Sequence, residues 1–215
     1  MVRRVSFASD AVPLPATVSQ EQVERPLRSL LRSKPSLRWA VCAMVLSGLG
    51  MAMFAAVSVL WLQAALGWDG EEVGLFLSFG SCLQLVSQVV VLPCLFKITR
   101  WREIRVAKIC LIANAFKFMA LCSVQDSRWV FAILIAAAPG FCGTPVLFSL
   151  CTHQVPKADK RRWHFALTAL NTVATVLGAL AGSHLLVLGL QGSRPLGTPL
   201  FFAAACYFLA GGCPG

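Results

Sequence analysis

The chain has 215 residues, of which 57% are hydrophobic and only 13% charged, with a net charge of +10 and a mean hydropathy of +0.72. Soluble domains carry roughly a quarter charged residues, so this composition excludes an ordinary soluble domain and predicts a membrane protein. Each helical span needs about 20 mostly apolar residues, and six runs in the chain approach that length.

Residues 1–38 precede these runs and differ from them in composition. They contain four prolines and seven of the nineteen Lys and Arg residues, without a long apolar run. Low hydrophobicity and high charge predict a mobile segment, in which 26–38 (PLRSLLRSKPSLR) fits a short basic amphipathic helix on a membrane surface. The opening MVRRVSFAS has the Arg and Ser bias of an organellar transit peptide, a second interpretation that Asp10 interrupts.

The six apolar runs follow one another with short connectors. They lie at 39–66, 73–96, 106–124, 129–151, 165–190 and, more briefly, 199–212. Short connectors require neighbouring spans to be antiparallel, and continuous runs differ from the ~10-residue alternating segments of a membrane β-barrel. We therefore expect an all-α membrane domain over 39–215, with about six transmembrane helices.

The basic residues gather on one side of these predicted helices. Seven lie in 1–38, five in 97–108 and four in 155–164, whereas the alternate loops hold only Arg128 and Arg194. The positive-inside rule orients helices by the Lys and Arg of their short loops, which predicts a cytosolic N-terminus or its organellar equivalent. Nucleic-acid binding explains none of this alternation, so we expect the lipid bilayer, and no nucleic acid, as a partner.

Polar side chains form one stripe in the second run and another in the fifth, at the spacings of three and four that share a helix face. The stripes consist of Ser78, Ser81, Gln84 and Gln88, and of Thr168, Asn171, Thr172 and Thr175. They either join helices by hydrogen bonds, worth about 0.6 kcal/mol per pair, or face a water-filled cavity. The first interpretation suits Ser and Thr, and the second makes Gln84, Gln88 and Asn171 candidate cavity residues.

Lys117 is the only ionisable residue near the middle of a predicted span. We expect its stem to lie along the helix while the ammonium group reaches the membrane interface. No Asp or Glu lies deep in any span, so these helices supply no carboxylate for a proton relay.

The fourth run combines helix-breaking residues with an uncharged apolar stretch. Pro139, Gly140, Gly143 and Pro145 lie between WVFAILIAAA and VLFSLC. In a bilayer such residues are tolerated because neighbouring helices bind the freed backbone groups. The pattern predicts a kinked helix that forms the moving wall of a cavity.

Two glycines of the fifth run have the spacing of a helix-packing motif. Gly178 and Gly182 form a GxxxG. Small residues at this spacing let two membrane helices approach closely, so we expect a tight helix contact here.

The chain lacks the residue patterns of an enzyme. Its nine cysteines all lie within or beside apolar runs, with no CxxC pair and no His or Cys cluster of metal-binding spacing. A nucleophile–base pair and a phosphate-binding loop are also missing. We therefore expect no catalytic residue, no metal site and no cofactor.

Three segments together resemble the C-terminal half of a major facilitator superfamily transporter of the tetracycline/proton antiporter type. They read GWDGEEVGLFLSFGSCLQLVSQ, PGFCGTPVLFSLCTHQVPKADKRR and ALTALNTVATVLGALAGSHLL, and the resemblance covers about residues 39–210. The positions that carry it are Gly67 and Trp68, then Gly143, Thr144, Pro145, Val155 and Pro156, and finally Gly178.

The chain departs from this resemblance at two places. Arg161 and Phe165 stand where the family has glycines after the Val-Pro, and Ala179 stands where a proline commonly follows the glycine. The family's N-terminal half is also absent, so this chain is expected to hold half of a transport site.

The resemblance implies how such a half works. Transporters of this kind rock one six-helix half against another around a site between them. The first, second, fourth and fifth spans would line the cavity, and the third and sixth would support them. A small organic solute would contact Gln84, Gln88, Asn171 and Thr175, and the partner would be a second six-helix half or a second copy of the chain. The alternative is a non-transporting scaffold or accessory subunit, or a truncated transporter fragment.

Overall fold

The computed structural model describes residues 35–99, 102–124, 126–155, 159–192 and 195–212. Within these ranges the chain is helical and contains no strand, in agreement with the all-α expectation. The predicted amphipathic helix at 26–38 lies outside the described residues, except for 35–38, which form the first turn of a membrane helix.

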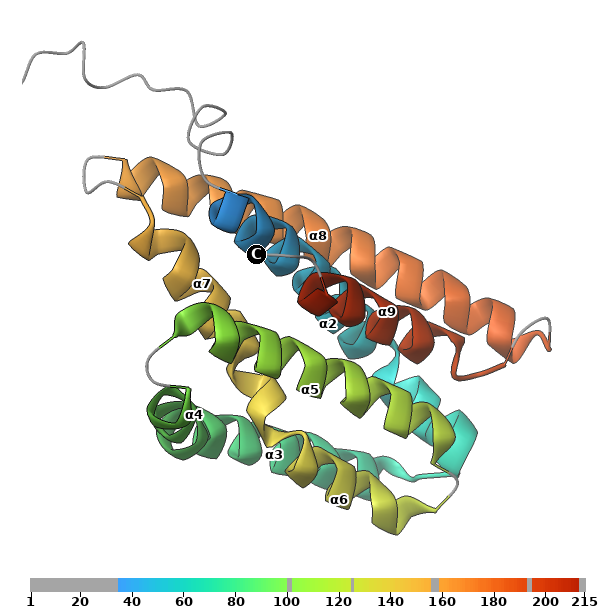
Figure 1. Ribbon diagram of the computed structural model, residues 1–215. Coiled ribbons are helices and arrows are strands. Elements are labelled where there is room, and N and C mark those ends of the chain that lie inside the picture. Colours follow the sequence, from blue (N-terminus) through green and yellow to red (C-terminus); the bar gives the residue numbers. More distant parts are fainter. Residues whose placement is uncertain (1–34, 100–101, 125, 156–158, 193–194, 213–215) are drawn as a thin grey trace, which may run out of the picture.

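The helices follow the apolar runs closely (Figure 1). In chain order they are α2 (Pro35–Leu66), α3 (Gly70–Val86), the π-helix η2 (Ser87–Val91), α4 (Leu92–Ile98), α5 (Glu103–Ser123), α6 (Ser127–Ala136), the 3-10 helix η3 (Ala138–Cys142), α7 (Gly143–His153), α8 (Lys160–Leu190) and α9 (Thr198–Gly212). The second run is thus one span with a π-helical turn inside it, and the fourth is a span broken by η3.

The connector between α2 and α3 shows how local sequence sets the helix ends. Gly67 adopts a φ of 69°, the left-handed conformation that terminates helices at little cost for glycine. Two residues later, Asp69 Oδ1 accepts hydrogen bonds from the backbone N–H groups of Glu71 and Glu72, at 3.0 and 2.9 Å. The Glu72 carboxylate in turn accepts the Asp69 backbone N–H at 3.3 Å, which completes a capping box.

The helices pack in a defined set of pairs. The helix α8 lies along α2, α9 packs on both α2 and α5, and α3 contacts α6 and η3. Figure 1 shows α8 and α2 along one edge of the bundle, α3 and α6 along the opposite edge, and α5 between them. Consequently α3 and α8 stand apart, on either side of the other spans.

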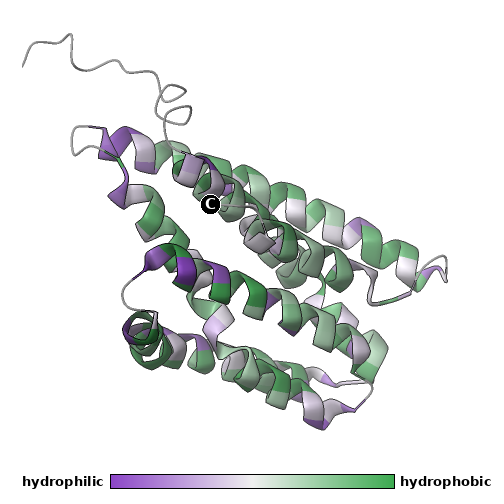
Figure 2. Ribbon diagram, in the orientation of Figure 1, coloured by the Kyte–Doolittle hydropathy of each residue, from purple (hydrophilic) through white to green (hydrophobic). Residues whose placement is uncertain are grey.

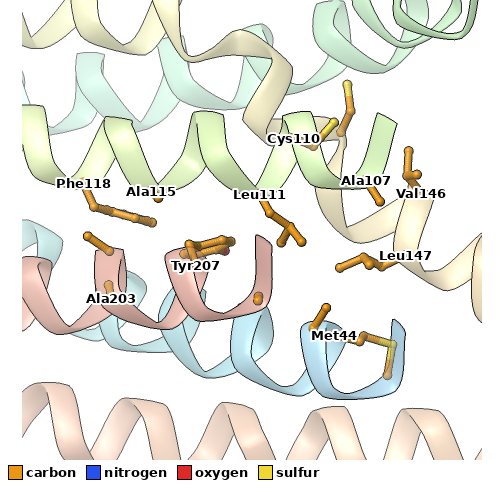
Figure 3. Packing of buried hydrophobic residues seen from close by; sticks show 14 of the residues in the cluster. Met44, Ala107, Cys110, Leu111, Ala115, Phe118, Val146, Leu147, Ala203 and Tyr207 are labelled. Carbon is orange, nitrogen blue, oxygen red and sulfur yellow. The ribbon is translucent and has the colours of Figure 1, made fainter. Parts of the chain in front are cut away.

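The core fills the space between α5, α9 and the first half of α2 (Figure 3). Tyr207 and Phe118 pack with their ring centroids 5.5 Å apart. The Tyr207 hydroxyl donates to the Ser47 carbonyl at 3.1 Å, and Trp39 Nε1 donates to the Ala210 carbonyl at 3.0 Å. These two bonds fix α9 against α2 with its polar groups satisfied, as an apolar interior requires.

Four of the described helices are long and apolar enough to cross a membrane: α2, the continuous Gly70–Ile98, α5 and α8. The bent pair of α6 with η3 and α7 adds a fifth when taken as one span. The last apolar helix, α9, has only 15 residues, which is shorter than a span. Figure 2 shows apolar residues along most of the helices and hydrophilic residues mainly near their ends, as expected for an integral multi-pass membrane protein.

Candidate functional site: a broken span and two polar faces

The fourth span bends by 53° at η3. Pro139 lies in the first turn of η3, where it cannot donate a backbone hydrogen bond and clashes with a continuing α-helix. The backbone resumes α-helical geometry at Gly143, and Pro145 lies in the first turn of α7, where a proline is tolerated. The prolines thus bracket the break.

A side chain from the third span stabilises this break. Asn114 Nδ2 donates a hydrogen bond of 2.7 Å to the Gly140 carbonyl. A Cβ atom at position 140 would lie only 2.6 Å from Asn114 Oδ1, so glycine is required for the approach. Asn114 is 5% exposed. Sequence reasoning did not single it out, although an amide in the middle of an apolar span is itself a functional signal.

The second span has its own irregular segment opposite the break. In η2 the Ser87 carbonyl accepts the backbone N–H of Leu92, five residues on, and also the Cys142 thiol at 3.2 Å. Ser87 is fully buried, and its hydroxyl has no hydrogen-bond partner among the residues that the structure describes. Short π-helical segments recur at functional sites, and here one contacts the 3-10 break of the neighbouring span.

The polar stripe of the second span lies on a face that the bundle leaves uncovered. Gln84 on α3 and Gln88 on η2 are both exposed. The Ser81 hydroxyl donates to the Leu77 carbonyl of its own helix at 2.8 Å. Gln84 and Gln88, together with the exposed Ser78, are therefore the polar side chains that this face presents outward.

The stripe of the fifth span is arranged differently. The hydroxyls of Thr168, Thr172 and Thr175 each donate to the carbonyl one turn earlier in α8, at 2.8 to 2.9 Å. Asn171 is half-buried against α2, where a Cβ at Gly48 would lie 2.5 Å from its Oδ1. The four candidate residues therefore do not converge: Gln84 and Gln88 lie on one edge of the bundle, and Asn171 and Thr175 lie on the other.

The GxxxG residues lie where α8 meets α2. A Cβ at Gly182 would lie 2.9 Å from the Met53 Cα, and a Cβ at Gly178 would lie 3.0 Å from both the Leu49 Cα and the Ala52 Cβ. The contact is thus between backbones, which only glycine allows.

The position of Lys117 differs from the sequence-based expectation. Its side chain does not reach the membrane interface: it is 2% exposed and lies inside the bundle. Its Nζ lies 4.4 Å from the ring centroid of Phe118, 4.7 Å from that of Phe141 and 5.7 Å from that of Phe54. Aromatic rings from three elements attract the ammonium group inward, and two of them come from spans that are distant in sequence.

The family model of the Major Facilitator Superfamily matches residues 5–183 of the chain. The matched residues include α2 through most of α8, with the broken span and both glycines of the GxxxG. No curated protein and no solved structure gave a significant match.

Proposed function

Because this chain belongs to the major facilitator superfamily, whose members are transporters, we propose that it moves a small organic solute across a membrane as one six-helix half of such a transporter. The observation that carries this proposal is the uncovered polar face on each of α3 and α8. Both faces lie on helices that frame the broken span and α2, where a transport cavity between two halves would open.

The burial of the spans supports this interpretation. In the most apolar 18-residue window of each helix, 50% of the residues are buried for α2 and for α5, but only 28% for α8 and 11% for Gly70–Ile98. Lipid can cover the exposed apolar residues of these helices. It cannot solvate Gln84 and Gln88, because polar groups facing hydrocarbon are costly. Water, a solute or a second helical body must therefore meet this face.

The proposed solute site joins the two edges. Gln84 and Gln88 supply amide donors and acceptors from one side, and Asn171 with Thr175 supplies them from the other. Groups that both donate and accept suit a neutral or zwitterionic solute with several polar atoms. The tetracycline/proton antiporters, which the chain resembles, are the first class of transporter to test.

The partner in this proposal is a second six-helix body, either another copy of this chain or a separate half. It would cover the faces of α3 and α8 and close the cavity from the other side. The N-terminus would lie in the cytosol, because 1–38, 97–108 and 155–164 carry most of the basic residues. The bent fourth span, held by Asn114, would be the wall that moves.

Transport in proteoliposomes tests this proposal, with tetracycline and ethidium as probes and an imposed proton gradient. We expect accumulation by the purified chain in a demonstrated dimer or a reconstituted pair of halves. The triple substitution Gln84→Leu, Gln88→Leu and Asn171→Leu should reduce uptake at least tenfold. Ser123→Ala serves as the control, because its hydroxyl bonds to Met119 within α5, away from both proposed faces.

A protein that acts as a scaffold or accessory subunit gives a different result. The departures at Arg161 and Phe165 motivate this alternative, since both side chains are exposed at the start of α8. In that case the paired protein moves neither probe, and the triple substitution leaves its cellular phenotype unchanged. This combination of results would replace the transport proposal with the scaffold.

A further inference from the structure

Lys117 is a buried amine that has no acidic partner among the described residues. Within the described residues it makes no hydrogen bond and no ion pair, and its Nζ meets only the three phenylalanine rings. The described acidic residues all lie at helix ends or in connectors: Asp69, Glu71, Glu72, Glu103, Asp126 and Asp159. Of these, Glu103 has its Oε1 3.6 Å from His153 Nδ1.

Such an arrangement is unusual in an apolar interior. Ionisable side chains within membrane spans generally pair with one another or with backbone carbonyls, and they mark binding sites or ion pathways. Ring faces attract an ammonium group, but they do not accept its three hydrogen bonds as an anion does. The N–H groups of Lys117 therefore have no hydrogen-bond acceptor among the described residues.

A cavity adjoins this lysine. It lies between α5 and α6 and has a volume of about 270 Å³. Besides Lys117, the cavity is lined by Ala113, Phe116, Ala120, Ile133, Ala136 and Ala137. Four alanines create the space, and every lining side chain except Lys117 is apolar.

We propose that this cavity binds a small organic anion, namely a monocarboxylate with an apolar body, whose carboxylate pairs with Lys117. The single cation supplies the charge, the alanines and Ile133 supply the apolar walls, and Phe116 offers a ring for stacking. At about 30 Å³ for each water molecule, the volume corresponds to roughly nine waters, which suits a one-ring or short-chain acid and excludes a two-tailed lipid.

This site is separate from the proposed transport cavity. It lies on α5 and α6, whereas the polar faces of the solute site lie on α3 and α8. It adjoins the broken span just before the bend, since Ala136 and Ala137 of its lining precede η3. The binding proposal does not rest on transport, and its test needs no transport measurement.

The test measures binding of benzoate to the full chain in lipid nanodiscs, by isothermal titration calorimetry and by the shift in melting temperature. A ligand that binds only the folded state raises the melting temperature with concentration. We expect saturable binding of benzoate, and no binding of benzamide, which has the same ring without the charge.

Three variants separate the possible causes. Lys117→Met keeps the stem and removes the charge, and it should weaken benzoate binding by roughly tenfold or more, as expected for a lost charge-assisted hydrogen bond. Ala120→Phe keeps the charge and fills the cavity, so it should also abolish binding. Lys108→Met is the control, because Lys108 lies over the Trp39 ring, away from the cavity, and its affinity should match that of the unchanged chain.

Two results would overturn the proposal. One is the absence of saturable benzoate binding by the unchanged chain, and the other is equal affinity in the Lys117→Met and unchanged proteins. Loss of binding in Lys117→Met with normal binding in Ala120→Phe would also contradict it, because the carboxylate would then pair with Lys117 outside this cavity.

Discussion

Asn114 and Gly140 form the contact that holds the fourth span in its bent shape: the amide of one donates to the carbonyl of the other at 2.7 Å. A 3-10 break frees backbone carbonyls that α-helical bonding would otherwise satisfy. In a bilayer no water is available to replace those bonds, so a neighbouring side chain must do so. The third span, which the family resemblance treats as an outer support, thus takes a direct part in shaping the fourth span.

Replacing Asn114 by Leu should destabilise the fold, because the Gly140 carbonyl then loses its partner in a buried place. We expect a loss of about 1–3 kcal/mol, the usual cost of an unsatisfied buried polar group, seen as a lower melting temperature in detergent. Ser123→Ala is the matched control on the same helix, since its exposed hydroxyl bonds only to Met119 of its own helix. Equal melting temperatures for the two variants would show that the Asn114 bond contributes nothing.

Gly140→Ala should be as damaging as the loss of Asn114, for a steric reason. The added Cβ would lie 2.6 Å from Asn114 Oδ1 and 3.1 Å from its backbone nitrogen, so the two spans must separate. Gly74→Ala provides the comparison, because nothing lies within 4 Å of a Cβ there and alanine favours a helix by about 0.5–1 kcal/mol over glycine. The melting temperature should fall in the first variant and stay level or rise in the second.

Gly182→Ala should loosen the contact of α8 with α2. Its Cβ would meet the Met53 backbone at 2.9 Å, and a backbone cannot move aside as a flexible side chain can. We expect a lower melting temperature and faster proteolysis in the loop after α8. Gly80→Ala, another helical glycine with open space around it, should show neither effect. A GxxxG contact that tolerates alanine would mean that the two helices lie farther apart than the structure shows.

The proposed cavity face of α3 is testable by its access to water. In a cysteine-free background, Gln84→Cys should react with a charged methanethiosulfonate reagent in intact membranes. Val86→Cys, an exposed position two residues on and on another side of the helix, should stay unreactive because lipid covers it. A lack of reaction at Gln84→Cys, matching that at Val86→Cys, would place the glutamine face in lipid and remove it from the solute site.

Lys117→Met should raise the melting temperature of the ligand-free protein. Replacing a buried charge by an apolar side chain of similar length is often neutral or stabilising, by about 1–4 kcal/mol. Lys108→Met, at a half-buried position nearer the end of α5, should change stability little. A lower melting temperature in Lys117→Met would show that the three ring contacts outweigh the desolvation of the ammonium group.

The extent of the helices followed directly from the sequence, because a span is defined by the length of its apolar run. Four of the six predicted starts lie within three residues of the observed ones. The two larger differences are α2, which begins at Pro35 instead of 39, and α8, which begins at Lys160 instead of 165. At both places the helix continues into charged residues beyond the apolar run, where hydropathy carries no information.

The direction in which a side chain points was harder to predict. Lys117 has two adjacent phenylalanines, Phe116 and Phe118, but the rings that draw it inward also include Phe54 and Phe141, which only the folded bundle brings near. The π-helix at Ser87–Val91 contains no proline or glycine of its own; Pro93, two residues further on, is the only nearby helix-breaking residue in the sequence, and the contact with η3 appears only in the folded bundle. The roles of Gln84, Gln88, Asn171 and Thr175 stay predictions, since the surface that would complete their site is not part of this bundle.

The close backbone contact at Gly178 and Gly182 has a mechanical consequence. Two long helices in direct backbone contact resist sliding and bending, so α2 and α8 should move together as one rigid unit. The opposite edge contains two irregular segments from different spans, η2 and η3. They contact each other where the Cys142 thiol donates to the Ser87 carbonyl. Any deformation of the bundle should therefore occur mainly at η2 and η3, while α2 and α8 keep their positions relative to each other.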